Sequence, residues 1–230
     1  MTDIPLASLD DQPAMRVDVW ADIVCPWCRL GKAYLERAIQ DFAHADDVVV
    51  LWHSFELDPN APAVRTESLS EHLSQKLGRT PEQVGEIHEQ IQSRGAAVDV
   101  GFDFENARSG NTFDAHRLLH LAAARGRQDE LATALYEAYH AGGEPIGDVE
   151  ALQRIAVAAG LDSDEARGVL ASDAFADDVR ADERAAQQMG ISGVPFFVFD
   201  GRIAASGAQP PEVLLAGLNQ AWTSRTTPSE

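Results

Sequence analysis

The sequence predicts an α/β domain that is interrupted by an inserted α-helical domain. Strand, helix and strand patterns follow one another near the start of the chain, helical patterns fill its middle, and two short strand patterns and a helix close it. The order is therefore β-α-β, a block of helices, then β-β-α. A chain with this order leaves a sheet, forms helices and returns to the same sheet.

The boundaries follow from where the patterns change. Residues 15–65 and 190–222 are expected to form the discontinuous α/β domain, and residues 66–189 to form the almost wholly helical insertion. Residues 1–14 and 223–230 are polar and are expected to be flexible tails.

The first unit is a strand, a helix and a second strand. Apolar residues alternate with polar ones over 15–24, which is typical of a strand with one buried face. A helical pattern follows, and Pro26 suits its first turn because the N–H that proline lacks would have no partner there. A second strand is expected over 48–55. A βαβ unit of this length pairs its strands in parallel.

The middle and the end of the chain are read in the same way. Thr80-Pro81 and Asn111-Thr112 are expected to begin helices, and further helices are expected over 129–140, 148–159 and 163–170. The apolar run 194–199 is typical of a central strand. Asp200-Gly201 then predicts a tight hairpin into 202–206, and Pro210-Pro211 precedes the last helix.

Composition excludes several classes of function. The 230 residues carry 18 Lys and Arg against 37 Asp and Glu, a net charge of -19, so nucleic acid and anionic membranes are not expected partners. Two cysteines are too few for a disulfide framework. The first fifteen residues have neither a basic start nor an apolar run, so the expected compartment is the cytoplasm.

The cysteine pair Cys25 and Cys28 is the strongest chemical signal. It lies between a strand and a helix, and the unpaired N–H groups of a helix start stabilise a thiolate at Cys25. Cys28, one turn later, can attack a mixed disulfide, so Cys25 is the expected nucleophile and Cys28 the resolving thiol. We expect Cys25 to be exposed and Cys28 shielded. Half of a zinc site and a pair of inert buried thiols are the alternatives.

Several motifs, taken together, resemble the DsbA family of thioredoxin-fold oxidoreductases, and its FrnE-like branch in particular. The resemblance covers about residues 15–222. It rests on Cys25-Pro26-Trp27-Cys28, Gly31-Lys32, Ser54-Phe55-Glu56-Leu57-Asp58-Pro59, Gly110-Asn111-Thr112 with Ala115-His116-Arg117-Leu118, and Gly193-Val194-Pro195-Phe196-Phe197.

The resemblance implies a thioredoxin-like fold with a helical insertion, and dithiol–disulfide exchange with protein or small-molecule substrates. It implies that Pro195 follows a cis peptide bond and faces the cysteine pair, where Val194 can pair with a substrate backbone. Pro26 and Trp27 are expected to support the site, Trp27 either by shaping a substrate surface or by packing. No bound cofactor is expected, and glutathione or another thiol is the expected redox partner.

Two other functions stay open. The same family includes kappa-class glutathione transferases and hydroxychromene carboxylate isomerases, which typically have serine at the position of Cys25, so the intact pair favours redox chemistry. The third hypothesis is a non-catalytic binding or chaperone protein that uses the groove alone. Neither an isomerase nor a binding protein needs the resolving thiol Cys28.

Polar residues near the motifs are candidates for secondary roles. Asp22 is a possible proton relay for the thiols, although a partner for the helix dipole is the favoured interpretation. Glu56 is a second possible relay, although an exposed charge at the strand end is favoured.

The insertion contributes further candidates. By resemblance, Asn111, Thr112 and His116 lie where the insertion meets the cysteines, so they either line the substrate groove or cap and pack a helix. His116 and His120 share a helix face but have no third ligand in sequence reach, so no metal site is expected.

Overall fold

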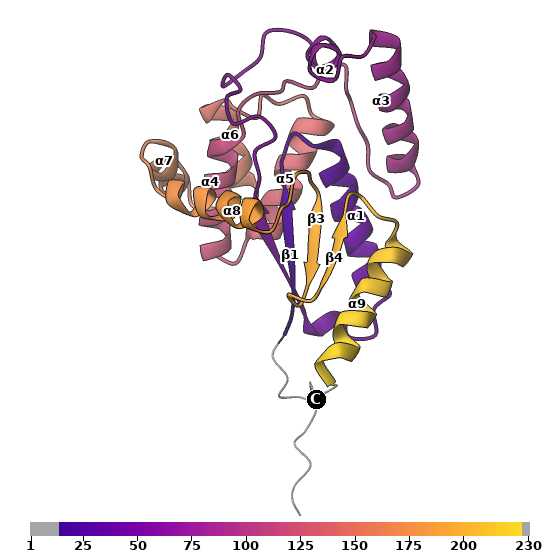
Figure 1. Ribbon diagram of the computed structural model, residues 1–230. Coiled ribbons are helices and arrows are strands. Elements are labelled where there is room, and N and C mark those ends of the chain that lie inside the picture. The colour runs from indigo at the N-terminus through magenta and orange to yellow at the C-terminus, as the bar shows by residue number, and fades with distance from the viewer. Residues whose placement is uncertain (1–13, 227–230) are drawn as a thin grey trace, which may run out of the picture.

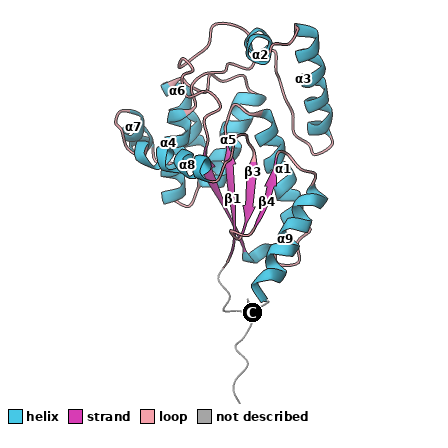
Figure 2. Ribbon diagram, in the orientation of Figure 1, coloured by secondary structure: helices cyan, strands magenta, loops and turns pink. Residues whose placement is uncertain are grey.

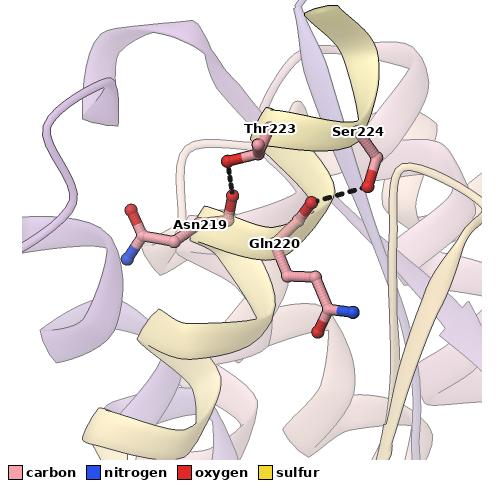
Figure 3. Close-up of a pocket in the computed structure, with 4 residues that line it drawn as sticks. All are labelled: Asn219, Gln220, Thr223 and Ser224. Carbon is pink, nitrogen blue, oxygen red and sulfur yellow. Dashed lines mark hydrogen bonds between the residues drawn. The ribbon is translucent and has the colours of Figure 1, made fainter. Parts of the chain in front are cut away.

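The computed structural model describes residues 14–226, and residues 1–13 and 227–230 lie outside the described residues. The expected tails therefore fall largely outside the structure. The boundary at 223 is nevertheless wrong, because helix α9 (Pro211–Thr226) continues past it. The hydroxyl groups of Thr223 and Ser224 in its last turns donate to the carbonyl groups of Asn219 and Gln220, one turn earlier (Figure 3).

The described residues form one four-stranded sheet in the order β2-β1-β3-β4 (Figure 1). Strand β1 (Met15–Ala21) pairs in parallel with β2 (Val48–Ser54), as the βαβ pattern predicts. Strand β3 (Phe196–Phe199) returns antiparallel to β1, and β4 (Ile203–Ser206) pairs antiparallel to β3. The hairpin between them turns at Asp200 and Gly201, whose φ angles of 52° and 66° are those that an Asp-Gly hairpin requires.

Helices cover both faces of the sheet. Helix α1 (Pro26–Gln40) and α9 pack together, and the core between them and the sheet contains Leu30, Leu35 and Leu218. On the other face, Trp20 packs with Ala186 of α8 (Ala176–Gln188). The expected polar face of β1 is therefore buried from Asp18 onward, because α8 covers it, whereas Arg16 stays exposed.

The insertion contains helices and loops. Residues 55–195, all of them described, form seven helices and no strand (Figure 2). Besides α8 these are α2 (Leu69–Leu77), α3 (Pro81–Ala96), α4 (Phe113–Ala124), α5 (Gln128–His140), α6 (Val149–Ala158) and α7 (Ser163–Leu170).

The insertion is less helical than expected, because residues 97–112 form a long irregular segment. Phe102 and Phe104 are buried in this segment and stack on each other, so extended chain supplies apolar contacts where a helix was expected. The division of the chain into two domains at 65 and 190 stays a prediction.

Candidate active site

Three chain segments meet at one edge of the sheet. Strand β1 ends at Ala21 and leads through Asp22 to Cys25, while β2 ends at Ser54 and leads to Glu56. Strand β3 runs the opposite way, so its first residues, after Pro195, lie at the same edge. Figure 1 shows α1 beginning at this edge and the last turn of α9 at the opposite end. The surface hollow lined by the four α9 residues of Figure 3 is therefore not part of this edge.

Cys25 is the N-cap of α1, and Pro26 is its first helical residue. The Cys25 carbonyl oxygen accepts hydrogen bonds from the N–H groups of Cys28 (3.0 Å) and Arg29 (3.3 Å), which starts the helix. Its thiol donates to the carbonyl oxygen of Val194 at 3.7 Å. The residue is only 4% exposed, so the expected exposure is wrong. Cys25 instead faces a cavity beneath the insertion.

Cys28 lies one turn into α1 and is fully buried. Burial raises the pKa of the Cys28 thiol well above its ordinary value, and the neighbouring Cys25 raises it further. The backbone of Asp22 opposes this shift by a hydrogen bond to the sulfur. Cys28 therefore holds its proton at neutral pH unless a neighbouring group accepts it.

The Val194–Pro195 peptide bond is cis. Pro195 packs against α1 at Gly31, where a Cβ atom would lie 2.8 Å from Pro195 Cγ. The Pro195 carbonyl oxygen accepts a hydrogen bond from Gly207, which ties the loop to the end of β4. Glycine at position 31 thus permits the close approach of the proline loop to the cysteine helix.

A cavity of about 300 Å³ opens beside Cys25. It is roofed by the insertion, and its wall is mostly apolar. Trp27 lines it and also packs under the guanidinium group of Arg94, 5.4 Å from the ring centroid, so this side chain both shapes the cavity and packs. The wall is made by Val24, Cys25, Pro26, Trp27, Leu57, Asp58, Ala61, Arg65, Leu69, His72, Leu73, Lys76, Leu77, Ile87, His88, Ile91, Phe104, Ser109, Gly110, Tyr139 and His140.

Asp22 is fully buried, and it lies close enough to Cys28 for its charge to raise the pKa of that thiol. Its Oδ2 accepts a hydrogen bond from the N–H of Leu57 at 2.7 Å, whereas its Oδ1 has no hydrogen-bond partner. His116 Nε2 lies 3.5 Å from that oxygen, and both ring nitrogens of His116 are buried without a hydrogen bond. The favoured interpretation of Asp22 as a partner for the helix dipole misses this buried pair.

Glu56 is also buried, so the expected exposed charge is wrong. Its carboxylate accepts hydrogen bonds from Arg180 of α8 at 2.6 Å and from Asn111 at 3.4 Å. Burial raises the pKa of Glu56, although Arg180 opposes the shift. Asn111 Oδ1 also accepts the N–H of Phe113, so Asn111 caps α4 and Glu56 fastens two helices of the insertion to the end of β2.

Thr112 and His116 are buried, and neither they nor Asn111 form part of the cavity wall described above. Thr112 occupies the N-cap position of α4 without a capping hydrogen bond from its side chain. The two histidines of α4 diverge, since His120 lies beside Ser54 and Asp182. In the part of the chain that the structure describes, no group of three His, Cys, Asp or Glu side chains is arranged to hold a metal ion.

Residues 16–219 match the family model of the DSBA-like thioredoxin domain. The chain belongs to the DsbA-like thioredoxin family. The fold and the family that the sequence resembles are thereby confirmed.

Among solved structures, this DsbA-like chain is similar to a probable DsbA oxidoreductase from Streptomyces coelicolor. The two are 44% identical with a TM-score of 0.89, over 94% of this chain and 93% of the other. The uncharacterized protein YwbO of Bacillus subtilis is 27% identical over 196 residues, which are 84% of this chain and 91% of YwbO.

Two further structures are similar in fold alone. The cytosolic disulfide reductase DsbM from Pseudomonas aeruginosa, with GSH, has a TM-score of 0.62 at 15% identity, over 90% of this chain and 99% of DsbM. A 2-hydroxychromene-2-carboxylate isomerase has a TM-score of 0.66 at 13% identity, over 94% of this chain and 100% of the isomerase.

Two polar residues of the cavity wall of this DsbA-like chain were not predicted from the sequence. His88 of α3 and Tyr139 of α5 belong to no motif and lie far from the cysteines in sequence. One signal for His88 was available, because it shares a helix face with Val84 and Ile91, and a polar residue on an apolar face needs an explanation. Within the described residues, no helix is long and apolar enough to cross a membrane.

Proposed function

We propose that the chain is a dithiol–disulfide oxidoreductase with Cys25 as nucleophile and Cys28 as resolving thiol. One observation carries the proposal: Cys25 faces the cavity from the start of α1, while Cys28, one turn behind it, is sealed from solvent. A thiol that faces a cavity, with a fully buried thiol behind it, is the order that attack and resolution require. Membership of the DsbA-like family supports the same reaction class.

The exchange proceeds in two balanced steps. The Cys25 thiolate attacks one sulfur of a substrate disulfide, forms a mixed disulfide and expels the other sulfur as a thiolate, which takes up a proton. Cys28 then loses its proton, attacks Cys25 Sγ and expels the second substrate thiolate. Two electrons pass from the protein to the substrate, and Cys25–Cys28 becomes a disulfide. A thiol returns the pair to the reduced form; glutathione is one candidate, and no bound cofactor takes part.

Asp22 is the proposed proton acceptor for Cys28. The high pKa of the buried thiol makes its deprotonation the difficult part of resolution, and the free Oδ1 of Asp22 is a buried base with His116 behind it. Glu56 is proposed to hold the end of β2 rather than to relay protons, since Arg180 and Asn111 occupy its carboxylate. Val194 is proposed to present its carbonyl group beside Cys25 to an extended substrate.

The proposed compartment is the cytoplasm, and the proposed substrates are protein or small-molecule disulfides. The fold similarity to a cytosolic disulfide reductase supports this assignment. An isomerase of the glutathione-dependent kind has the same fold, but the second thiol at Cys28 has no role in that reaction.

Mass mapping of trapped intermediates tests the proposal. The reduced protein is mixed with a model disulfide, quenched with an alkylating agent and digested. We expect Cys25→Ser to lose exchange, and Cys28→Ser to accumulate a mixed disulfide on Cys25, because attack survives and resolution fails. If Cys28 is alkylated first, or carries the mixed disulfide in the wild type, the nucleophile assignment is wrong. If Cys25→Ser keeps full glutathione-dependent isomerase activity, the chain is an isomerase.

A further inference from the structure

Two buried polar atoms in the cavity wall have no hydrogen-bond partner. They are Nε2 of His88, a residue 8% exposed, and the hydroxyl group of Tyr139, a fully buried residue. The Tyr139 hydroxyl group has no partner at normal hydrogen-bond geometry, although the Ser109 side chain is near enough to lower the pKa of the phenol. Both residues line the cavity that Cys25 faces. Buried polar groups in folded proteins are nearly always paired, and an unpaired one lowers stability. Two such groups in one cavity can bond to a ligand or to the water that a ligand displaces.

Both groups are uncharged at neutral pH. Burial lowers the pKa of His88, so its imidazole is neutral, and it stacks on Phe104 with ring centroids 4.0 Å apart. Burial raises the pKa of the Tyr139 phenol, which keeps its proton. His140, deeper in the wall, is also neutral, because burial lowers its pKa to about 3. The inner wall thus offers hydrogen bonds without charge.

The charges of the wall are paired only in part, because Lys76 has a carbonyl oxygen and no carboxylate as its partner. Arg65 pairs with Asp58 and with Glu67, and the Lys76 ammonium group donates to the carbonyl oxygen of Leu57. The remaining wall is made largely of leucine and isoleucine side chains from α2 and α3. At His88 and Tyr139, which are both neutral, a charged ligand group would lose its hydration without gaining a counter-charge, whereas an uncharged amide would hydrogen-bond to both side chains.

We propose that this cavity binds the uncharged, amide-bearing arm of a small-molecule disulfide, with the amide hydrogen-bonded to His88 Nε2 and the Tyr139 hydroxyl group while its sulfur reaches Cys25. The inference rests on the proposed function and names the substrate class of that site. A cavity of about 300 Å³ is at the lower end of the range for small-molecule sites. With Cys25 only 4% exposed, a slender ligand reaches the thiol more readily than a disulfide on a folded protein.

Four aliphatic disulfides test the proposal. Bis(2-acetamidoethyl) disulfide carries neutral amides, cystamine carries ammonium groups, dithiodipropionate carries carboxylates, and glutathione disulfide carries both charges. Each oxidises the reduced wild-type protein at constant ionic strength, and each rate is divided by the rate with dithiothreitol to remove intrinsic reactivity. We expect the normalised rate of the acetamide probe to exceed that of every charged probe by about tenfold or more. The acetamide gains one or two hydrogen bonds, and it avoids the cost of removing water from a charged group.

Two conservative variants test the residues. His88→Phe keeps a ring on Phe104 but removes the nitrogens, and Tyr139→Phe removes one hydroxyl group. Each should cut the acetamide advantage about five- to tenfold. His44→Phe is the matched control, because His44 also stacks on an aromatic ring, that of Trp222 at 4.1 Å, outside the cavity wall; it should keep the advantage.

The outcomes separate this inference from the proposed function. If no probe forms a mixed disulfide on Cys25, the proposed function fails. If exchange occurs but normalised rates do not depend on the arm, or both variants keep the acetamide advantage, the inference is overturned. Faster exchange with oxidised insulin than with every small probe also overturns it, because the occupant is then a protein segment. Should either variant fail to fold, the other variant and the wild-type comparison decide.

Discussion

Gly31 is a residue at which the absence of a side chain sets the distance between the cysteine helix and the proline loop. In Gly31→Ala, the new Cβ would lie 2.8 Å from Pro195 and 3.1 Å from Phe197. Overpacking costs about 1–3 kcal/mol, and the gain in helix propensity returns about 0.5–1. We expect a net loss of about 1–2 kcal/mol in unfolding free energy and slower disulfide exchange, measured by urea denaturation and by a model-disulfide assay.

Gly85→Ala is the matched control. Gly85 lies inside α3, and a Cβ atom there would meet nothing within 4 Å. The same substitution should therefore stabilise the protein by about 0.5–1 kcal/mol and leave exchange unchanged. Equal effects of the two substitutions would show that Gly31 is not constrained by Pro195.

Sequence alone located the cysteine pair because its context is local. A strand pattern, a cysteine at the N-cap and a proline at the first helical position all lie within a few residues of one another. The environment of Glu56 was not predictable, because its partner Arg180 lies 124 residues away on a helix that any pattern would read as solvated. The same holds for His88, which reaches the cavity only through the packing of α3.

At the scale of the elements, a buried charge cluster fastens α8 to the sheet. His53 of β2 lies between Asp18 of β1 and Asp182 of α8, at 2.6 and 2.7 Å. Burial lowers the pKa of His53, but hydrogen bonds to the two carboxylates outweigh this effect and raise the pKa to about 9. His120 of α4 and Arg16 of β1 are the other charged or titratable groups that contact these carboxylates.

The cluster predicts a loss of stability at alkaline pH. A raised folded-state pKa means that the His53 charge stabilises the fold fully below its unfolded pKa of 6.5 and that this contribution is lost as the pH rises through about 9. The contribution is at most about 3 kcal/mol. In His53→Gln, the deficit relative to the wild type should be large at pH 6 and shrink by pH 10, by urea denaturation at each pH. The two proteins have the same cysteines, so the effect of thiol titration on stability cancels when the variant is compared with the wild type. A deficit that stays constant with pH would contradict the charge assigned to His53.

Most elements were predictable from periodicity, and the errors arose where elements meet. Helix α7 has the expected bounds, 163–170, because the residues that determine it are local: Asp162 caps it and Ala166 and Val169 form its buried side. The alternation in β1 predicted one polar face, yet Asp18 and Trp20 are buried, because α8 returns to cover that face. Residues 97–112 read as part of a helical block, although burial of Phe102 and Phe104 favours an extended path.

For the whole molecule, the net charge of -19 predicts how charged disulfides respond to salt. A negative field concentrates cations near the surface and repels anions, and salt screens both effects. Between 10 and 500 mM NaCl, we expect the rate of oxidation by cystamine to fall about threefold and that by dithiodipropionate to rise by a similar factor.

The acetamide probe provides the internal reference for this measurement. Its rate should change less than twofold over the same range of salt, because it carries no charge. If the rates of all three probes changed with salt in the same way, the electrostatic field of the net charge would have no effect at the Cys25 thiol. The preference among arms at high salt would then report the cavity wall alone.

The contact between the Cys25 thiol and Val194 also sets an order of events during biosynthesis. The two residues are 169 positions apart, whereas the cysteines are made almost together. At about 5–20 residues per second, a ribosome needs on the order of 10–30 seconds to reach the proline loop after the cysteines. During that interval the thiols are an ordinary pair in a nascent chain. The cysteines thus acquire their native environment only after β3 has been translated. Until then, the oxidation state of the two thiols is set by the redox conditions of the cell and not by contacts within the protein.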